Sequence, residues 1–214
     1  MKRKGLRKVY LLLFIGLMVS IFLMKPAAAP AEEVRGVRND MVKIGVIPDM
    51  TGPAATDWLA AVEGFRNYVR YVNGEGGVHG RKIKDIYEDS RYTIPGDIAA
   101  FKKLVFKDEI FAMLGASSTG GTVALFPQIE KHKLPTVAAS QAESMYTPPK
   151  RYVFCTAAGY SEEVKVLFDF IMKDLKAKNP RIGIVYPDVE FGKTNLEQAK
   201  KSAKHYGVDL YSEV

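Results

Sequence analysis

The sequence predicts an α/β protein in which a parallel sheet carries helices on both faces. Strand-like and helix-like patterns alternate from residue 41 to residue 214. The first strand pattern, Met41–Pro48, is almost continuously apolar, as expected for a parallel strand that is covered on both sides. A helical pattern at Trp58–Asn73 then stops at glycines, and the chain returns as a second strand, which makes a βαβ unit. This architecture hosts many functions and identifies none by itself.

The same alternation continues along the rest of the chain. The expected later strands are residues 81–88, 110–114, 135–138, 151–155, 181–186 and 208–214. The expected later helices are residues 94–108, 122–131, 161–176 and 190–206. The helix at 161–176 has Ser161 as its predicted N-cap. Its predicted apolar stripe consists of Val164, Leu167, Phe168, Ile171 and Leu175. Residues 115–121 and 139–150 are expected to be loops.

Residues 1–31 have the pattern of an export signal. Five basic residues precede a 16-residue run, Val9–Met24, that is apolar apart from Gly16 and Ser20, and small residues follow. We expect cleavage after Ala31, because a cut two residues earlier would leave a proline at the first mature position. An uncleaved membrane anchor is the alternative, although a spanning helix needs ~20 apolar residues.

The net charge gives no indication of nucleic-acid binding once the signal is set aside. The chain has 31 Lys and Arg residues against 24 Asp and Glu, a formal charge of +7. Six of the basic residues and none of the acidic ones lie in residues 1–31, so the remaining 183 residues carry +1. Nucleic-acid binding would need a basic face on the folded domain.

The residues that usually carry metal or covalent chemistry are few and scattered. The single Cys155 cannot form an internal disulfide, and an exported protein is expected to keep such a thiol buried and inert. His79, His132 and His205 match no zinc spacing. No phosphate-binding Gly-x-x-x-x-Gly-Lys loop and no Gly-x-Ser-x-Gly nucleophile motif is present. The sequence therefore predicts no cofactor and no metal site.

Two loops of the first βαβ unit carry a family resemblance. The Thr51-Gly-Pro loop and the segment Asn73-Gly-Glu-Gly-Gly-Val-His-Gly80 resemble the leucine/isoleucine/valine-binding proteins of bacterial ABC transporters. The resemblance covers residues 41–214 and implies the type I periplasmic-binding-protein-like fold with two lobes. Residues 41–155 would form the first lobe and residues 156–214 the start of the second. Because family members are longer, we expect the chain to lack part of the second lobe.

The loop at residues 115–121 is the first candidate ligand site. It follows a predicted parallel strand and precedes a helix, where backbone N–H groups and the helix dipole attract an anion. Its hydroxyl residues are Ser117, Ser118 and Thr119. The resemblance implies that the Thr119 hydroxyl binds the α-carboxylate of a ligand and that Ser118 adds a backbone contact. The alternative is a small-residue turn that only packs helix against strand.

The resemblance implies a second ligand-binding loop after the fourth strand. It places a backbone carbonyl of Ala138 on the ligand ammonium and the hydroxyl of Ser140 on the carboxylate, in a register that can shift by a residue. The segment that follows lacks the family's common proline, so Gln141 is a possible substitute contact. An ordinary polar loop is the alternative reading of this segment.

Aromatic residues are the remaining candidates. Trp58, the only tryptophan, lies within one position of the family's aromatic wall residue, and Asp57 is the gap-free match. Phe191 resembles a second-lobe aromatic that stacks on the ligand, and Tyr160 lies near the predicted crossover between lobes. Each could instead be a core residue. The family's acidic anchor for the ligand ammonium belongs to a later segment, so no residue here is given that role.

We therefore expect an extracytoplasmic, periplasmic solute-binding protein that is a monomer and performs no catalysis. It would bind a branched-chain amino acid or a similar small amphipathic solute between its lobes and deliver it to the membrane permease of an ABC transporter. An extracellular sensory domain of the same fold is the main alternative. A flavodoxin-like hydrolase using Asp49, Asp89 and His79 is a third, although His79 in its glycine turn fits a turn role better.

Overall fold

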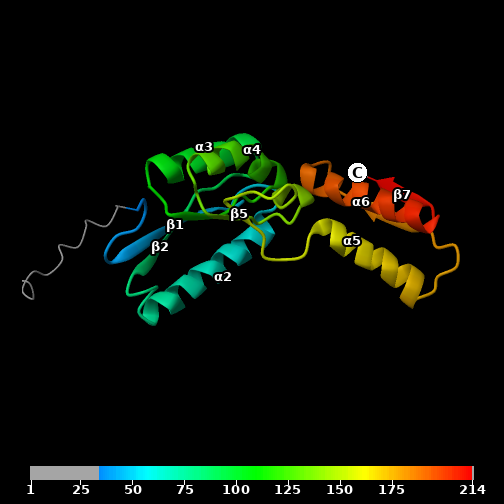
Figure 1. Cartoon of the computed structure of the whole chain (residues 1–214), viewed down its shortest axis with the longest axis horizontal. Helices are drawn as coiled ribbons and strands as arrows, with labels where there is room; N and C mark the ends of the chain where they lie inside the picture. Colours follow the sequence, from blue (N-terminus) through cyan, green and yellow to red (C-terminus); the bar gives the residue numbers. More distant parts are fainter. Residues whose placement is uncertain (1–33, 214) are drawn as a thin grey trace, which may run out of the picture. The chain divides into compact units, whose positions relative to one another are not determined.

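Five parallel strands in the order β2-β1-β3-β4-β5 form the larger sheet, called here the first sheet (Figure 1). The structure is a computed structural model, and it describes residues 34–213. The predicted export signal lies outside the described residues. The strands of the first sheet are β1 (Met41–Ile47), β2 (Lys82–Tyr87), β3 (Ala112–Gly115), β4 (Thr136–Val137) and β5 (Val153–Phe154).

Helices cover both faces of the first sheet, as the sequence predicts. Helix α2 (Ala55–Gly74) lies on one face, and α3 (Ile94–Phe106) and α4 (Thr119–Lys131) lie side by side on the other (Figure 1). The core between the sheet and the helices is formed mainly by apolar side chains. Its most buried members are Ile47, Phe101, Leu104, Ile110, Met113, Leu125, Ile129 and Leu134.

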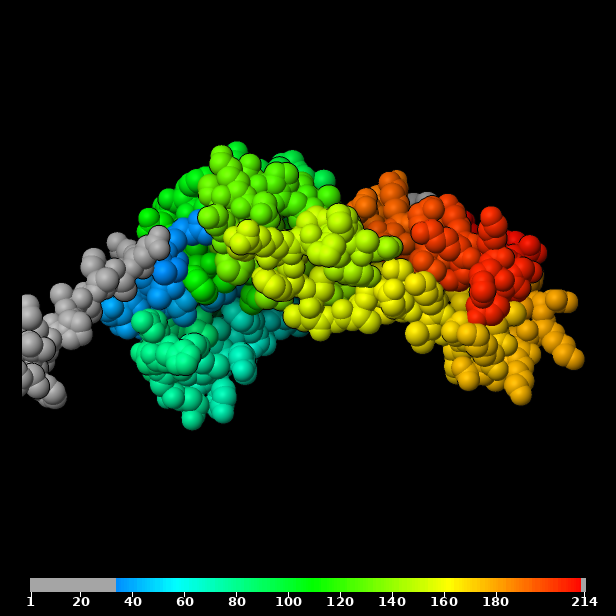
Figure 2. Space-filling model, in the orientation of Figure 1, coloured from blue at the N-terminus to red at the C-terminus, as the bar shows by residue number. Residues whose placement is uncertain are grey.

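Helix α2 is amphipathic, and one side of it faces solvent. Val62 and Val69, two turns apart, are buried against the first sheet. Tyr68 and Tyr71 lie on the open side and are 63% and 64% exposed. The space-filling view shows this helix, in cyan, standing out from the surface (Figure 2). No helix among residues 34–213 has the length and apolar character needed to cross a membrane.

Two further parallel strands form the second sheet, β6 (Ile182–Val185) and β7 (Leu210–Glu213). Helix α5 (Tyr160–Asp169) continues into the π-helical turn η2 (Phe170–Asp174) and packs against α6 (Glu190–Tyr206). Val164 and Phe168 of α5 form a small core with alanines of α6. Helix α6 ends at Gly207, whose φ of 65° is the left-handed conformation that glycine adopts without strain. The predicted lobe boundary after residue 155 falls between the two sheets and stays a prediction.

Several local predictions are wrong. Helix α4 begins at Thr119, not at residue 122, because Ser118 caps it by accepting a hydrogen bond from the N–H of Gly121. Helix α5 begins at Tyr160 after Gly159, so Ser161 lies inside its first turn and is not its cap. Residues 143–145, expected as loop, form the 3₁₀ turn η1 (Glu143–Met145).

The apolar stripe predicted for the helix at residues 161–176, which corresponds to α5 and η2, is also partly wrong. Leu167 and Leu175 are each 60% exposed. Leu175 follows the π-helical turn, which adds a residue to the turn and rotates the later side chains. Leu167 is exposed because α5 meets α6 along the narrower line of Val164 and Phe168. Cys155, expected to be buried, is only partly so, and burial raises the pKa of its thiol.

Candidate functional site

The loops that follow β1, β2, β3 and β4 meet at one edge of the first sheet, because parallel strands end on the same side. The strand register places Ile47 beside Gly115 and Leu114 beside Val137. The candidate site is built from these loops. In an open α/β sheet this edge is where ligands bind.

Two carboxylates fix the loop between β1 and α2. The backbone N–H groups of Gly52 and Ala54 donate to the two carboxylate oxygens of Asp49 at 2.6 and 2.8 Å. Asp89, at the end of β2, accepts from the N–H of Met50 at 2.8 Å and from the Thr51 hydroxyl at 2.5 Å. These bonds hold the pKa of Asp89 below its usual value, against the opposing effect of burial. Both carboxylates are thus engaged in holding the loop, which positions the start of α2.

The hydroxyls of Thr119 and Ser140 meet where α4 begins. Their oxygen atoms are 2.9 Å apart, within a buried hydrogen bond. Ser140 also accepts a hydrogen bond from the N–H of Ala142 at 3.2 Å, which shapes the loop after β4. Since α4 begins at Thr119, the unpaired N–H groups of its first turn lie beside this pair. A negatively charged ligand group is favoured at such a place.

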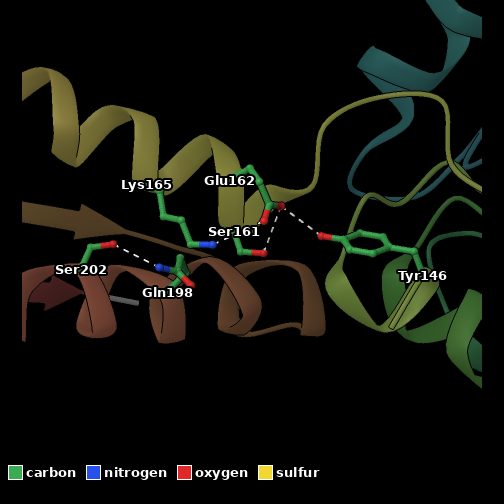
Figure 3. A network of polar contacts seen from close by, with 6 residues as sticks. All are labelled: Tyr146, Ser161, Glu162, Lys165, Gln198 and Ser202. Carbon is green, nitrogen blue, oxygen red and sulfur yellow. Dashed lines mark hydrogen bonds and ion pairs between the residues drawn. The ribbon is translucent and has the colours of Figure 1, made fainter. Parts of the chain in front are cut away.

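The start of α5 is attached to the loop after β4. The N–H of Tyr160 donates to the carbonyl of Gln141 at 3.1 Å. The Tyr146 hydroxyl donates to Glu162 Oε2, also at 3.1 Å, and Figure 3 shows this bond beside Ser161 and Lys165. That hydrogen bond is the main cause that lowers the pKa of Glu162. These contacts hold the first turn of α5, which carries Tyr160.

A cleft of about 560 Å³ opens over these loops. Its lining residues come from the edge of the first sheet, from the start of α5 and from the loop before α6. They are Pro53, Ala54, Asp57, Trp58, Tyr92, Ser117, Thr119, Ala139, Ser140, Tyr160, Pro187, Val189 and Phe191. The volume is in the range of sites for small molecules.

Aromatic rings form much of the cleft wall. Tyr160 and Phe191 stand edge to face, with ring centroids 5.1 Å apart and an angle of 78° between the rings. Trp58 and Tyr92 also line the cleft, from the start of α2 and from the loop before α3. Burial raises the pKa of the Tyr92 hydroxyl, and the negative charges of nearby acids add to the effect. The Tyr92 hydroxyl therefore stays protonated and can donate a hydrogen bond.

Five of the eight site residues predicted from the sequence line the cleft, and three do not. The five are Trp58, Thr119, Ser140, Tyr160 and Phe191. The side chain of Ser118 caps α4 and does not line the cleft, and its backbone contact with a ligand stays a prediction. Ala138 lines a smaller apolar cavity of about 190 Å³ under α2, and its neighbour Ala139 lines the cleft instead. Gln141 is buried, with an Oε1 atom that has no partner among the described residues.

Sequence reasoning missed several lining residues. Tyr92 follows the carboxyl end of β2, and this position could have been found from the rule that ligands bind at that edge. Pro187 and Val189 precede α6, and the predicted Phe191 lies in the first turn of this helix. Nothing in the local sequence separates them from ordinary loop residues.

The cleft lining contains little charge. Asp57 is its single charged lining residue, and no Lys, Arg or His of residues 34–213 lines it. A ligand anion would therefore be bound by hydroxyls and backbone N–H groups, not by an ion pair. Among the described residues no cluster of three potential metal ligands occurs.

A model of the family described as periplasmic binding protein matches residues 41–214. The chain belongs to this family. The curated "Leu/Ile/Val-binding protein homolog 3" of Brucella melitensis biotype 1 is 25% identical over 167 residues, which cover 78% of this chain and 44% of the relative. The resemblance read from the two loops is thereby confirmed.

Solved structures of the same fold support the assignment. A fatty acid ABC transporter substrate-binding protein from Thermomonospora curvata matches with a TM-score of 0.75 and 21% identity, over 85% of this chain and 46% of that one. A branched chain amino acid ABC transporter protein from Thermus thermophilus with bound valine matches with a TM-score of 0.72 and 24% identity, over 81% and 45%. The predicted periplasmic-binding-protein-like I fold is confirmed, and the chain spans about half the length of these proteins.

Proposed function

We propose that this chain contributes one side and part of the other side of the ligand cleft of an extracytoplasmic solute-binding protein. The observation that carries the proposal is the cleft itself, which combines hydroxyls at the start of α4 with four aromatic rings. A small solute with a carboxylate and an apolar body matches both features. A branched-chain amino acid is the first candidate, and other carboxylates with apolar bodies are chemically related to it.

The similar proteins support this ligand chemistry. The names of the two solved structures mention valine and a fatty acid, which share a carboxylate attached to an apolar body. The carboxylate would lie at the Thr119–Ser140 pair and the apolar body between the rings. Release of the solute to the permease of an ABC importer is the proposed context, and closure of the cleft around the solute is the proposed motion.

A role without catalysis fits the two acids of the hydrolase alternative. Asp49 accepts hydrogen bonds from the backbone of its own loop, and Asp89 accepts one from the N–H of Met50 in that same loop, so neither is free to act as a general base. His79, the third member of the hydrolase alternative, has a positive φ of 50° in its turn. We propose a binding protein and not an enzyme.

The test of this function is direct measurement of binding. Trp58 is the only tryptophan and lines the cleft, so a bound solute should change its fluorescence. L-Leucine, L-valine, L-phenylalanine, benzoate and octanoate should be titrated into the purified protein, with calorimetry as the second measurement. Trp58→Phe should lose the optical signal while calorimetry still reports binding. Absence of binding for all five carboxylates would refute the proposal.

Export is the second part of the proposal. The basic segment, apolar run and small residues of 1–31 support a periplasmic location with cleavage after Ala31. Mass spectrometry of the protein from the periplasmic fraction should give Glu32 as its first residue. An intact Met1 in a membrane fraction would favour the uncleaved anchor.

A further inference from the structure

A buried acid lies behind the start of α4. Asp97, in the first turn of α3, is 0% exposed. Its Oδ2 accepts a hydrogen bond from the Ser118 hydroxyl at 2.8 Å, and its Oδ1 has no partner among the described residues. A Cβ added to Gly121 would lie 1.7 Å from Oδ2, so the carboxylate is directly against the backbone of α4. A buried acid with a free oxygen needs a physical explanation.

Asp97 is linked to the cleft through one residue. Ser118 donates its proton to Asp97 and accepts from the N–H of Gly121 at 2.9 Å, which caps α4. Its chain neighbours Ser117 and Thr119 both line the cleft. The charge of Asp97 therefore lies at the same helix N-terminus that a ligand carboxylate would approach from the other side. Two negative charges at one helix end repel each other across a weakly screening interior.

The groups that face Asp97 give this carboxyl no neutralising partner. Asp49 faces it from the loop after β1, Ser90 and Tyr92 face it from the loop after β2, and Ser118 faces it from α4. Burial raises the pKa of the Asp97 carboxyl to about 6; the hydrogen bond from Ser118 and the nearby Ser90 hydroxyl lower it, and the charge of Asp49 raises it further. The proton of Asp97 is thus exchanged close to neutral pH.

We propose that Asp97 is a charge-tuning positioning residue of the ligand cleft, which takes up a proton when a carboxylate binds at the start of α4. This inference rests on the proposed function. The negative charge of ionised Asp97 repels the ligand carboxylate, whereas protonated Asp97 is neutral and does not. Affinity for a carboxylate therefore increases as the pH falls through the range in which Asp97 takes up its proton.

The geometry allows this proton to bind without loss of the cap. The proton goes from solvent to Oδ1, which has no other partner, while Oδ2 continues to accept from Ser118. Asp97→Asn imitates the protonated state, because its amide oxygen can accept the same hydrogen bond. The substitution removes the charge and keeps the shape.

Calorimetry with L-valine at about pH 5 and about pH 7.5 tests the proposal, because the ligand itself keeps its charges between these values. The wild type should bind several-fold more tightly at the lower pH, roughly threefold to tenfold for charges separated by a few residues. Asp97→Asn should bind with the same affinity at both pH values, and as tightly as the wild type at low pH. Asp209 is an exposed acid directly before β7, so the control variant Asp209→Asn should behave like the wild type.

Two further measurements test whether the pH dependence of binding comes from Asp97 and the ligand carboxylate. Near neutral pH, the wild type should take up a fraction of a proton on binding, measured in two buffers of different ionisation heat. Asp97→Asn should take up less. L-Valinamide, which lacks the carboxylate, should bind without the pH-dependent gain.

Equal pH dependence in the wild type and Asp97→Asn, with binding intact, would overturn the role of Asp97 and leave the proposed function standing. No binding of L-valine or the other carboxylates by either protein at any pH would overturn the function and the coupling together. If Asp97→Asn does not fold, the wild type alone decides, because binding without proton uptake near neutral pH contradicts the proposal.

Discussion

At the scale of single residues, the Thr119–Ser140 pair determines what the cleft can offer an anion. Each hydroxyl has one proton, and one of the two is used in the bond between them. Ser140 also accepts from the N–H of Ala142. The pair therefore has one O–H left to donate, beside the unpaired N–H groups of the first turn of α4. A carboxylate with two oxygens suits this combination.

Replacement of Thr119 by valine should weaken binding with little effect on folding. Valine keeps the shape and removes the hydroxyl, which is worth roughly 1.5–3 kcal/mol when it donates to a charged group. We expect the affinity for a carboxylate ligand to fall about tenfold or more in calorimetry. Thr194→Val is the matched control, because that hydroxyl bonds only to the carbonyl of Glu190 in its own helix. Equal affinity for wild type and Thr119→Val would contradict the assignment.

Asp49 should contribute to stability more than most single residues. Its carboxylate accepts two backbone N–H bonds and is completely buried. Asp49→Ala leaves two N–H groups without a partner, and each such loss costs about 1–3 kcal/mol. Asp49→Asn keeps one acceptor and should recover part of the loss. Urea denaturation of the three proteins measures the order; an Asn variant no better than Ala would mean that the loop does not depend on these bonds.

At the scale of elements, the sequence predicts the order of strands and helices, because periodicity and glycines mark them. It does not predict the start of α4, because Thr119, Gly120 and Gly121 have low helix propensity and resemble a loop. The helix starts there because Ser118 is held between the Gly121 N–H and Asp97, a partner 21 residues earlier in the chain. Such distant contacts are absent from a local pattern.

The absence of distant contacts from a local pattern also explains which site residues were predicted and which were missed. Trp58, Thr119, Ser140, Tyr160 and Phe191 line the cleft at positions that the resemblance indicated. The predicted role of Ala138 is a backbone carbonyl contact, which stays a prediction; of the two neighbouring alanines, Ala139 lines the cleft and Ala138 does not. Tyr92 and Asp97 come from the loop before α3 and from its first turn, where no motif drew attention to them.

Two glycines in helices should respond oppositely to alanine. At Gly121 a Cβ would lie 1.7 Å from the Asp97 carboxylate, so Gly121→Ala should displace the start of α4 and lower both stability and ligand affinity. At Gly64 in α2 a Cβ would meet nothing within 4 Å. Gly64→Ala should therefore stabilise the protein by about 0.5–1 kcal/mol. Thermal unfolding of both variants measures the contrast, and a tolerated Gly121→Ala would show that Asp97 is not packed against α4.

At the scale of the whole molecule, the cleft joins parts of the chain that belong to different sheets. Thr119 and Ser140 come from loops of the first sheet, whereas Val189 and Phe191 lie at the start of α6 beside the second. The bond from the N–H of Tyr160 to the carbonyl of Gln141 attaches the segment that connects the two sheets to a loop of the first sheet. A solute that fills this cleft should therefore contact both groups of residues.

Hydrogen exchange can test whether a bound solute contacts both groups of residues. Apart from the N–H of Gly121, which donates to Ser118, the N–H groups in the first turns of α4 and α6 have no partner within their helices, so they should exchange quickly in the free protein. Saturating L-valine, or whichever tested carboxylate binds, should slow exchange at residues 117–121 and also at residues 189–193. Residues 66–73 of α2, whose exposed side lies away from the cleft lining, provide the control and should not change. Protection of the first segment alone would mean that the start of α6 takes no part in binding, and that the ligand is held only by the loops of the first sheet.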